Sequence, residues 1–290
     1  MSIRKSRTPG GVEQAAAPAS ASASAFPPVT ISEHDGVRFL HLGSAWVQGA
    51  MRLRKPDRIE LDYVQRMLAS LLWLPPEALD DGLAVQLGLG AAAITRFTQQ
   101  QLGMHTIAVE LNPLVIQAAR LWFGLPVDGP RLQVLRMDAL HWLQQEAQPG
   151  SVRLLHVDLY DEEAAAPVLD DERFYAACRR ALTPGGVMAV NLFGRDASFD
   201  ASAARIAAVF GTDQVWSLRP TREGNTVVVA GRGVLVPGRE ALRQRAAAIE
   251  TRHGRLGLKA RDWLRMVRPW QPRALPRAPA AADSPGAVPA

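Results

Sequence analysis

The amino-acid sequence predicts a doubly wound, Rossmann-like α/β fold with a mostly parallel sheet and a small N-terminal antiparallel β element. Three observations support this prediction. From residue 84 onward, apolar runs alternate with amphipathic helical stretches, which is the pattern of a parallel sheet covered by helices on both faces. A glycine turn follows the first of these runs. Before the alternation begins, Val37 to Met51 has the pattern of two short strands around a turn at Gly43 and Ser44.

The elements of the fold follow one another without an internal repeat. A helix is expected over DYVQRMLASLLWL, and it stops at Pro75. The expected strands and helices then alternate in the order AVQLGL, AAITRFTQQQ, HTIAVEL, PLVIQAARLWF, RLQVLRM, ALHWLQQE, VRLLHVDL, ERFYAACRRAL and, after a turn at 183–186, VMAVNLF. A helix over 202–210 leads to the strands QVWSLRP and NTVVVAG, which we expect to form an antiparallel closing hairpin.

Charge and composition narrow the classes of partner. The 290 residues carry a net charge of +5, but segments 1–28 and 268–290 hold +2 each, which leaves the body close to neutral. Only the segment from Arg252 to Arg277 approaches the concentrated basic face that phosphate binding requires. The charge distribution therefore argues against nucleic acid as a partner.

The cysteine count, the histidine spacing and the length of the apolar runs argue against a disulfide-bonded, a metal-binding and a membrane-spanning protein. The single Cys178 allows no internal disulfide and fits a reducing cytoplasm. No apolar run reaches the length of about 18 residues that a membrane-spanning helix needs. The six histidines show no metal-type spacing. We therefore expect a cytoplasmic protein without a membrane segment or a metal site.

The turn after the first predicted strand carries the signal of a nucleoside site. Gly88 and Gly90 stand at the carboxyl end of this strand, where doubly wound sheets bind their ligands. Glycine lets the backbone turn sharply and approach a ligand without a Cβ in the way. Glu110 ends the next strand, at the position where an acidic side chain accepts hydrogen bonds from ribose hydroxyls. Together the two signals predict a nucleoside-binding site.

Further carboxylates follow the next two strands. Asp138 opens the helix after RLQVLRM, where it can cap the helix by accepting from amides near Leu140 and His141, or contact a ligand. The fourth strand ends in HVDLYDEE, which places four acids close together: Asp158, Asp161, Glu162 and Glu163. Because clustered carboxylates repel one another without a cation among them, this segment predicts a cationic ligand. A solvated acidic loop is the structural alternative.

These motifs, in this order, resemble the class I S-adenosylmethionine-dependent methyltransferases and, more narrowly, the spermidine synthase family of polyamine aminopropyltransferases. The narrower resemblance covers about residues 36–232 and rests on FLHLGSAWVQ, VELNPLVIQAAR, RLQVLRMDALHWLQ, VDLYD, FYAACRRALTPGGVMAVNLF and GNTVVVA. It implies a transferase of polyamine biosynthesis that moves an aminopropyl group from decarboxylated S-adenosylmethionine to a polyamine-type amine. Family members commonly form dimers or tetramers, so the resemblance implies a homo-oligomer, of which a homodimer is the simplest form.

The resemblance also implies roles for single residues. Six would surround the adenosine part of the cosubstrate: Gln48, Gly88, Gly90, Glu110, Asp138 and Ala139. Asp158 would be the catalytic group that orients and deprotonates the amine, and Asp161 and Tyr63 would bind the amine substrate. The chemistry is consistent with this assignment. The sulfonium is already a good leaving group, so the enzyme must mainly align the reactants and hold the amine unprotonated.

The sequence departs from the family pattern at three places. Ala91 stands where the family's loop carries an aspartate that binds the amino group of the decarboxylated cosubstrate. Tyr63, Val64 and Gln65 stand where Tyr-His-Glu is usual, and VDLYD replaces Asp-Ser-Ser-Asp-Pro. Two alternatives therefore stay open: a methyltransferase that uses intact S-adenosylmethionine, and a non-catalytic protein that keeps the fold.

We accordingly divide the chain into four segments. Residues 1–28 are expected to be a disordered leader, and residues 29–75 the N-terminal β element with its linking helix. Residues 76–250 are expected to form the nucleoside-binding α/β domain, and residues 251–290 a basic helix followed by a disordered tail.

Overall fold

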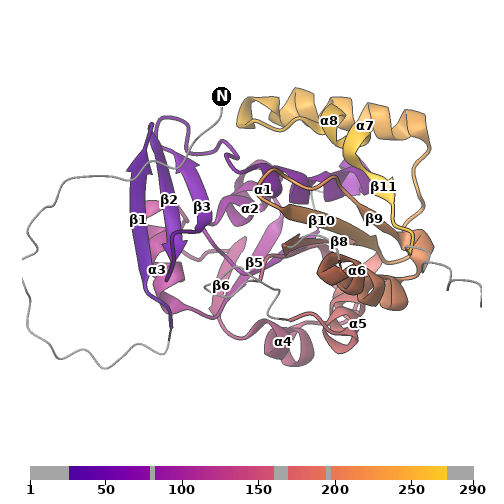
Figure 1. The fold of residues 1–290 in the computed structure, drawn as a ribbon, viewed down its shortest axis with the longest axis horizontal. Helices are drawn as coiled ribbons and strands as arrows, with labels where there is room; N and C mark the ends of the chain where they lie inside the picture. Colours follow the sequence, from indigo (N-terminus) through magenta and orange to yellow (C-terminus); the bar gives the residue numbers. More distant parts are fainter. Residues whose placement is uncertain (1–25, 79–81, 160–168, 194–196, 273–290) are drawn as a thin grey trace, which may run out of the picture.

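The computed structural model describes residues 26–78, 82–159, 169–193 and 197–272. Figure 1 shows a small sheet at one end of the molecule and a larger sheet between helices. The small sheet is antiparallel and contains β1 (Val29–His34), β2 (Val37–Leu42) and β3 (Val47–Arg52). The larger sheet has eight strands in the order β11-β9-β10-β8-β7-β4-β5-β6.

The central strands of the larger sheet are parallel, and its far edge is antiparallel. The parallel strands are β4 (Leu83–Leu87), β5 (His105–Glu110), β6 (Leu132–Arg136), β7 (Val152–Val157) and β8 (Leu182–Phe193). The antiparallel edge consists of β9 (Val215–Ser217), β10 (Asn225–Gly231) and β11 (Arg268–Pro269). The α/β fold with a mostly parallel sheet and the antiparallel closing hairpin are thereby confirmed.

The helical elements lie between the strands and after the last long one. The first half of the chain contributes α1 (Asp62–Met67), η1 (Leu68–Trp73), η2 (Pro76–Ala78), α2 (Ala93–Arg96), η3 (Phe97–Gln101), α3 (Pro113–Trp122), α4 (Ala139–His141) and η4 (Trp142–Glu146). The second half contributes α5 (Glu172–Ala181), α6 (Ala197–Phe210), η5 (Thr212–Gln214), α7 (Arg239–His253), η6 (Gly254–Leu256) and α8 (Ala260–Met266).

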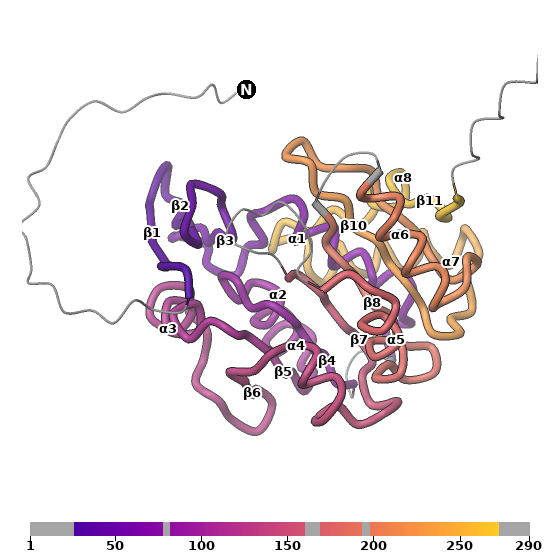
Figure 2. Tube along the Cα trace, turned by 60° about the horizontal axis from the view of Figure 1, so that its bottom comes forward, coloured from indigo at the N-terminus to yellow at the C-terminus, as the bar shows by residue number. Residues whose placement is uncertain are grey.

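Helices cover both faces of the larger sheet. One face packs on α1, η1, α7 and α8 through a core that includes Met67, Leu71 and Trp263. The other face packs on α5 and α6 through Phe174 and Ile206. A third core joins the small sheet to α3, and Figure 2 shows β1 beside that helix. Burial on both faces explains why the central strands β4 and β7 are mostly apolar.

The strand order places a topological switch point beside β4. The chain runs from β4 outward to β5 and β6 and then crosses back to β7 on the other side of β4. Connections that leave a strand edge in opposite directions open a crevice at the carboxyl ends of the strands. The glycine turn after β4 therefore lies at this crevice.

The structure differs from the sequence-based expectation in four details. The small sheet has three strands, because Val29–His34 pairs with β2 through a tight turn at Asp35 and Gly36, whose φ angles are 51° and 71°. The expected turn at 183–186 is an irregularity within β8, since Val152 pairs with Leu182 and Leu154 with Val187. Helix α6 begins at residue 197. Helix α7 runs across residue 250, so the predicted segment boundary there falls inside a helix.

Candidate active site

Two neighbouring cavities lie at the carboxyl ends of the central strands, and residues of the β2–β3 hairpin line both of them. The first, which we call the strand-end cavity, is lined by all six residues predicted to surround the adenosine: Gln48, Gly88, Gly90, Glu110, Asp138 and Ala139. Leu40, Val109 and Val115 supply apolar wall to the same cavity. Asp158 lines it as well. The structure thus brings together residues that lie up to 118 positions apart in the sequence, from Leu40 to Asp158.

Glycine is required at the first turn by both conformation and space. Gly88 has a φ of +84°, which lies in the region that disfavours residues with a Cβ. A Cβ on Gly88 would stand 2.1 Å from the backbone oxygen of Asp158. The amide of Gly88 donates to the carbonyl of Val109 at 2.9 Å, and the amide of Asp158 donates to the carbonyl of Leu87 at 2.9 Å. The turn is therefore in contact with the ends of both neighbouring strands.

Glu110 connects the first turn to the end of β5. Its Oε2 accepts from the amide of Leu89 at 2.9 Å, and its Oε1 accepts from the amide of Asn112 at 2.8 Å. Burial raises the pKa of Glu110, and the amide donors oppose this rise. The amide of Leu111 adds a third hydrogen bond to the carboxylate, whose two oxygens offer about four lone pairs in all, so capacity for a further donor remains. A structural role and a ligand role are therefore compatible at this residue.

Asp138 caps the helix after β6. Its Oδ1 accepts from the amide of His141 at 2.8 Å, which confirms the capping interpretation for this residue. Because Asp138 also lines the strand-end cavity, a contact with a ligand stays a prediction.

The second cavity, which we call the side cavity, is lined by residues of the β2–β3 hairpin, α1 and the ends of β7, β8 and β10. Its volume is about 590 Å³, which is within the range of small-molecule sites. Phe39, Trp46 and Tyr63 supply aromatic wall. Four carboxylates also line it: Glu60, Asp62, Asp158 and Glu223. The side cavity is therefore acidic and aromatic, which suits a cation with an apolar body.

Asp158 lines both cavities. Its Oδ1 accepts from Nδ2 of Asn191 at 2.9 Å, and Oδ1 of Asn191 accepts from Nδ2 of Asn225 at 3.2 Å. The hydroxyl of Tyr63 also hydrogen bonds to the Asp158 side chain. Burial raises the pKa of Asp158 to about 6, against these hydrogen bonds, which lower it. A carboxylate with such a pKa is ionised at neutral pH and is still a usable proton acceptor.

Gln48 also lines both cavities, and its amide nitrogen is unsatisfied. Among the described residues, the buried Nε2 atom has no hydrogen-bond partner. A buried donor without an acceptor costs about 1–3 kcal/mol. This cost is removed if a ligand oxygen or ring nitrogen accepts from Nε2, so Gln48 fits a ligand contact.

Ala91 is buried beneath β3. A Cβ built on Gly49 would stand 2.4 Å from the Cβ of Ala91 and 2.7 Å from its amide nitrogen. The glycine loop and the hairpin are therefore in direct contact at the position where the resemblance calls for an aspartate. With alanine at position 91 the loop carries no carboxylate there, and the close contact with Gly49 leaves little space for one.

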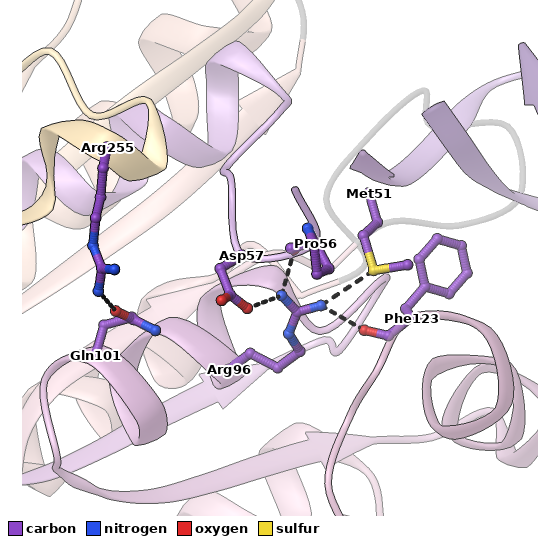
Figure 3. Close-up of polar contacts among 7 residues, drawn as sticks. All are labelled: Met51, Pro56, Asp57, Arg96, Gln101, Phe123 and Arg255. Carbon is purple, nitrogen blue, oxygen red and sulfur yellow. Dashed lines mark hydrogen bonds and ion pairs between the residues drawn. The ribbon is translucent and has the colours of Figure 1, made fainter. Parts of the chain in front are cut away.

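The buried Arg96 contacts β3 and the segment that follows it, and Figure 3 shows its polar contacts with Met51, Pro56, Asp57 and Phe123. One guanidinium nitrogen of Arg96 donates to the carbonyl of Phe123 at 2.6 Å and contacts the sulfur of Met51 at 3.3 Å. The other donates to the carbonyl of Pro56 and pairs with Asp57 at 3.1 Å. Burial lowers the pKa of Arg96, and Asp57 opposes this effect. Arg96 thereby joins α2, the end of α3 and the segment that follows β3.

Sequence reasoning found some of these residues and missed others. Tyr63 lies in the side cavity beside Asp158, whereas Asp161, Glu162 and Glu163 lie outside the described residues. The five missed residues of the side cavity are Glu60, Asp62, Asn191, Glu223 and Asn225. Only Asn191 had a usable signal, because it stands near the carboxyl end of a parallel strand.

The described residues show neither a membrane-spanning helix nor a metal-binding cluster. No helix in these segments is long and apolar enough to cross a membrane. Within the same segments, His, Cys, Asp and Glu side chains form no group of three or more that could hold a metal ion.

Structural comparison supports the fold. A probable spermidine synthase from Corynebacterium glutamicum superposes with a TM-score of 0.63 at 18% identity, covering 77% of this chain and 82% of that chain. Human methyltransferase-like protein 13, in complex with SAH, superposes with a TM-score of 0.58 at 24% identity, covering 74% of this chain and 97% of that chain. At these identities the likeness establishes the Rossmann-like methyltransferase fold alone.

Sequence comparison establishes the family. No family model matches the chain. The polyamine aminopropyltransferase of Chromobacterium violaceum is 33% identical over 246 residues, which cover 84% of this chain and 90% of that relative. An alignment of this extent includes the whole parallel part of the larger sheet. The chain therefore belongs to the polyamine aminopropyltransferase family.

Proposed function

We propose that the protein transfers an aminopropyl group from decarboxylated S-adenosylmethionine to a polyamine-type amine. The observation that carries the proposal is the position of Asp158 between the two cavities. A transfer reaction needs a donor site and an acceptor site that meet at one catalytic group. The strand-end cavity would hold the adenosine of the donor, and the side cavity would hold the acceptor amine.

The proposed donor site uses the six residues that line the strand-end cavity. Glu110 would accept from the ribose hydroxyls, as its place at the end of β5 suggests. Gly88 and Gly90 would allow close approach of the backbone, and the unsatisfied Nε2 of Gln48 would donate to the donor molecule. Asp138 and Ala139 would contact the base.

Asp158 would act as the proton acceptor. An alkylamine reaches the site as an ammonium, because its pKa resembles the value of about 10.4 for lysine. The Asp158 carboxylate would orient this nitrogen and take its proton. The nitrogen lone pair then attacks the carbon beside the sulfonium, the carbon–sulfur bond breaks, and its electrons neutralise the sulfur. The products are the aminopropylated amine, methylthioadenosine and a proton.

The proposal is tested by product release. Purified protein incubated with decarboxylated S-adenosylmethionine and 1,4-diaminobutane should release methylthioadenosine, measured by chromatography. If the protein binds the decarboxylated compound but releases no methylthioadenosine with any of several amines, aminopropyl transfer is excluded.

Methyl transfer from intact S-adenosylmethionine is the second candidate. The contact between Ala91 and Gly49 favours it, because the loop offers no carboxylate for the amino group of the decarboxylated compound. Calorimetric titration distinguishes the two functions. Tighter binding of intact than of decarboxylated S-adenosylmethionine would support methyl transfer, and the reverse order would support aminopropyl transfer.

Other sequence-based expectations remain part of the proposal. Asp161 would bind an ammonium group of the acceptor together with Tyr63, two copies of the chain would form a homodimer, and the protein would act in the cytoplasm. Residues 76–250 would carry the nucleoside site. Light scattering would test the homodimer, since a molecular mass near 31.5 kDa would exclude it.

A further inference from the structure

We infer that Glu223 binds the second cationic nitrogen of the acceptor, so that the side cavity selects diamines and longer polyamines over monoamines. The inference rests on the proposed function, because it treats the side cavity as the acceptor site. It adds a residue that determines which amine the site accepts.

Glu223 and Asp158 differ in their exposure to solvent at the side cavity. Both residues line the cavity, but Glu223 is exposed to solvent whereas Asp158 is partly buried. A molecule with one nitrogen at Asp158 therefore extends outward past Glu223. The wall of the cavity also includes Trp46, Leu61 and Tyr63, whose apolar surface suits the methylene chain of a polyamine.

Glu223 is the carboxylate of this cavity that remains free for a ligand cation. Glu60 accepts from Nε of Arg52 at 3.1 Å and lies 3.5 Å from Nε of Arg58. Asp62 pairs with Arg66 at 2.7 Å. Asp158 is engaged by Asn191. No arginine, lysine or histidine of the described segments forms an ion pair with Glu223, whose negative charge is thus uncompensated there.

The loop that carries Glu223 is fixed at both of its ends. The amide of Thr221 donates to the carbonyl of Asn225 at 2.7 Å, and the amide of Asn225 donates to Oγ1 of Thr221 at 3.2 Å. Thr221 itself is buried. A short turn closed by two reciprocal hydrogen bonds holds its central residues in one place. The backbone that carries Glu223 is therefore positioned.

The same loop is connected to the catalytic carboxylate. Nδ2 of Asn225 donates to Asn191, and Nδ2 of Asn191 donates to Asp158. Three hydrogen-bonded side chains thus relate the loop to Asp158. This connection positions the end of the loop relative to Asp158, which favours acceptors whose second nitrogen reaches Glu223.

The test compares two acceptors of equal chain length, 1,4-diaminobutane and 1-aminobutane, in the wild type and in Glu223→Gln. The substitution keeps the shape and removes the charge. We expect the KM for the diamine to rise about threefold to tenfold, because an exposed charge-assisted contact is worth less than a buried one. The kcat for the diamine and the KM for the monoamine should change less than twofold.

Glu146→Gln is the matched control, because Glu146 is also exposed and lacks an ion pair within the described segments but does not line either cavity. It should leave both KM values unchanged. Glu223→Lys should raise the diamine KM further, through repulsion between like charges. Equal changes for diamine and monoamine in Glu223→Gln, or no change for either, would overturn the inference while leaving the proposed function intact.

A binding measurement separates the inference from the reaction. Calorimetry in the presence of methylthioadenosine should show that Glu223→Gln binds 1,4-diaminobutane about threefold to tenfold more weakly than the wild type. If the wild type releases methylthioadenosine but both proteins bind the diamine equally, Glu223 does not bind the second nitrogen. If no amine yields methylthioadenosine, aminopropyl transfer itself fails.

Discussion

The two cavities that meet at Asp158 are built in different ways. The strand-end cavity is shaped by the backbone: its turn needs glycine at Gly88, and its carboxylates Glu110 and Asp138 accept from backbone amides. The side cavity is shaped by side chains from separate segments, and its carboxylates mostly face arginines or solvent. The first is suited to one fixed ligand shape, whereas the second can change its preference through single exposed residues.

This difference separates two tasks of a group-transfer enzyme. Binding of a donor common to a whole family can be fixed in the strand ends, which a core on each face of the sheet supports. The residues that select the acceptor can lie in a hairpin and a loop, where substitutions cost little stability. Asp158 belongs to both cavities, so changes there should have the largest effects.

Replacing the shared carboxylate tests the comparison most severely. Asp158→Asn should lower kcat by about 10²–10⁴-fold, because it removes the proton acceptor, while binding of the donor should change little. Steady-state kinetics and calorimetry with the donor would measure both effects. A variant that keeps more than a tenth of the wild-type kcat would show that Asp158 is not the base.

The same variant should be more stable at neutral pH. Burial raises the folded-state pKa of Asp158 from 3.8 to about 6, so the native state loses stability as the pH rises from about 4 to 6. Removing the charge should raise the free energy of unfolding at pH 7 by about 1–3 kcal/mol. Denaturant unfolding at pH 7 and pH 4 would check this, since the gain should disappear at pH 4.

Removing Arg96 tests whether the hairpin must be held over both cavities. Arg96→Met should lower the free energy of unfolding by about 3 kcal/mol, because the buried guanidinium satisfies two carbonyls and pairs with Asp57. It should also weaken binding of donor and acceptor together, since Gln48 lines both cavities. Arg255→Met, which removes an exposed contact with Gln101 at 3.3 Å (Figure 3), is the control and should cost less than about 0.5 kcal/mol.

The pH dependence of kcat tests the role of Asp158 without a substitution. With Asp158 as the base, log kcat should fall with decreasing pH around an apparent pKa near 6 and lose about tenfold per pH unit below it. Affinity for the nucleoside should stay nearly constant over the same range. An acid limb near pH 4 would assign the proton transfer to a carboxyl group of ordinary pKa.

The smallest effect is expected from the hydrogen bond that orients Asp158. Asn191 donates to the carboxylate and thereby lowers its pKa. Asn191→Leu should therefore move the acid limb to higher pH by less than one unit and reduce kcat at pH 7 by at most about twofold. Asn191→Ser, which keeps a donor, should recover part of the shift. A pH profile identical to that of the wild type would remove Asn191 from the mechanism.

The sequence predicts the residues of the strand-end cavity better than those of the side cavity. Strand-end rules identified Glu110, Asp138 and Asp158, and the structure places all three at one cavity. The side cavity escaped prediction, because Glu60, Glu223 and Asn225 come from segments with no local pattern and meet only in the folded chain. The first strand was missed because Val29–His34 is largely exposed and polar, although Asp35-Gly36 is a strong hairpin signal.

The contact between Gly49 and Ala91 has an evolutionary consequence. An aspartate at position 91 would have to grow into space that β3 already occupies, and any side chain at position 49 would collide with the loop. The two positions are therefore epistatic: neither can enlarge unless the hairpin backbone moves first. Restoring a carboxylate to this loop would therefore require concerted changes in the loop and in β3, and a single substitution at either position would not suffice.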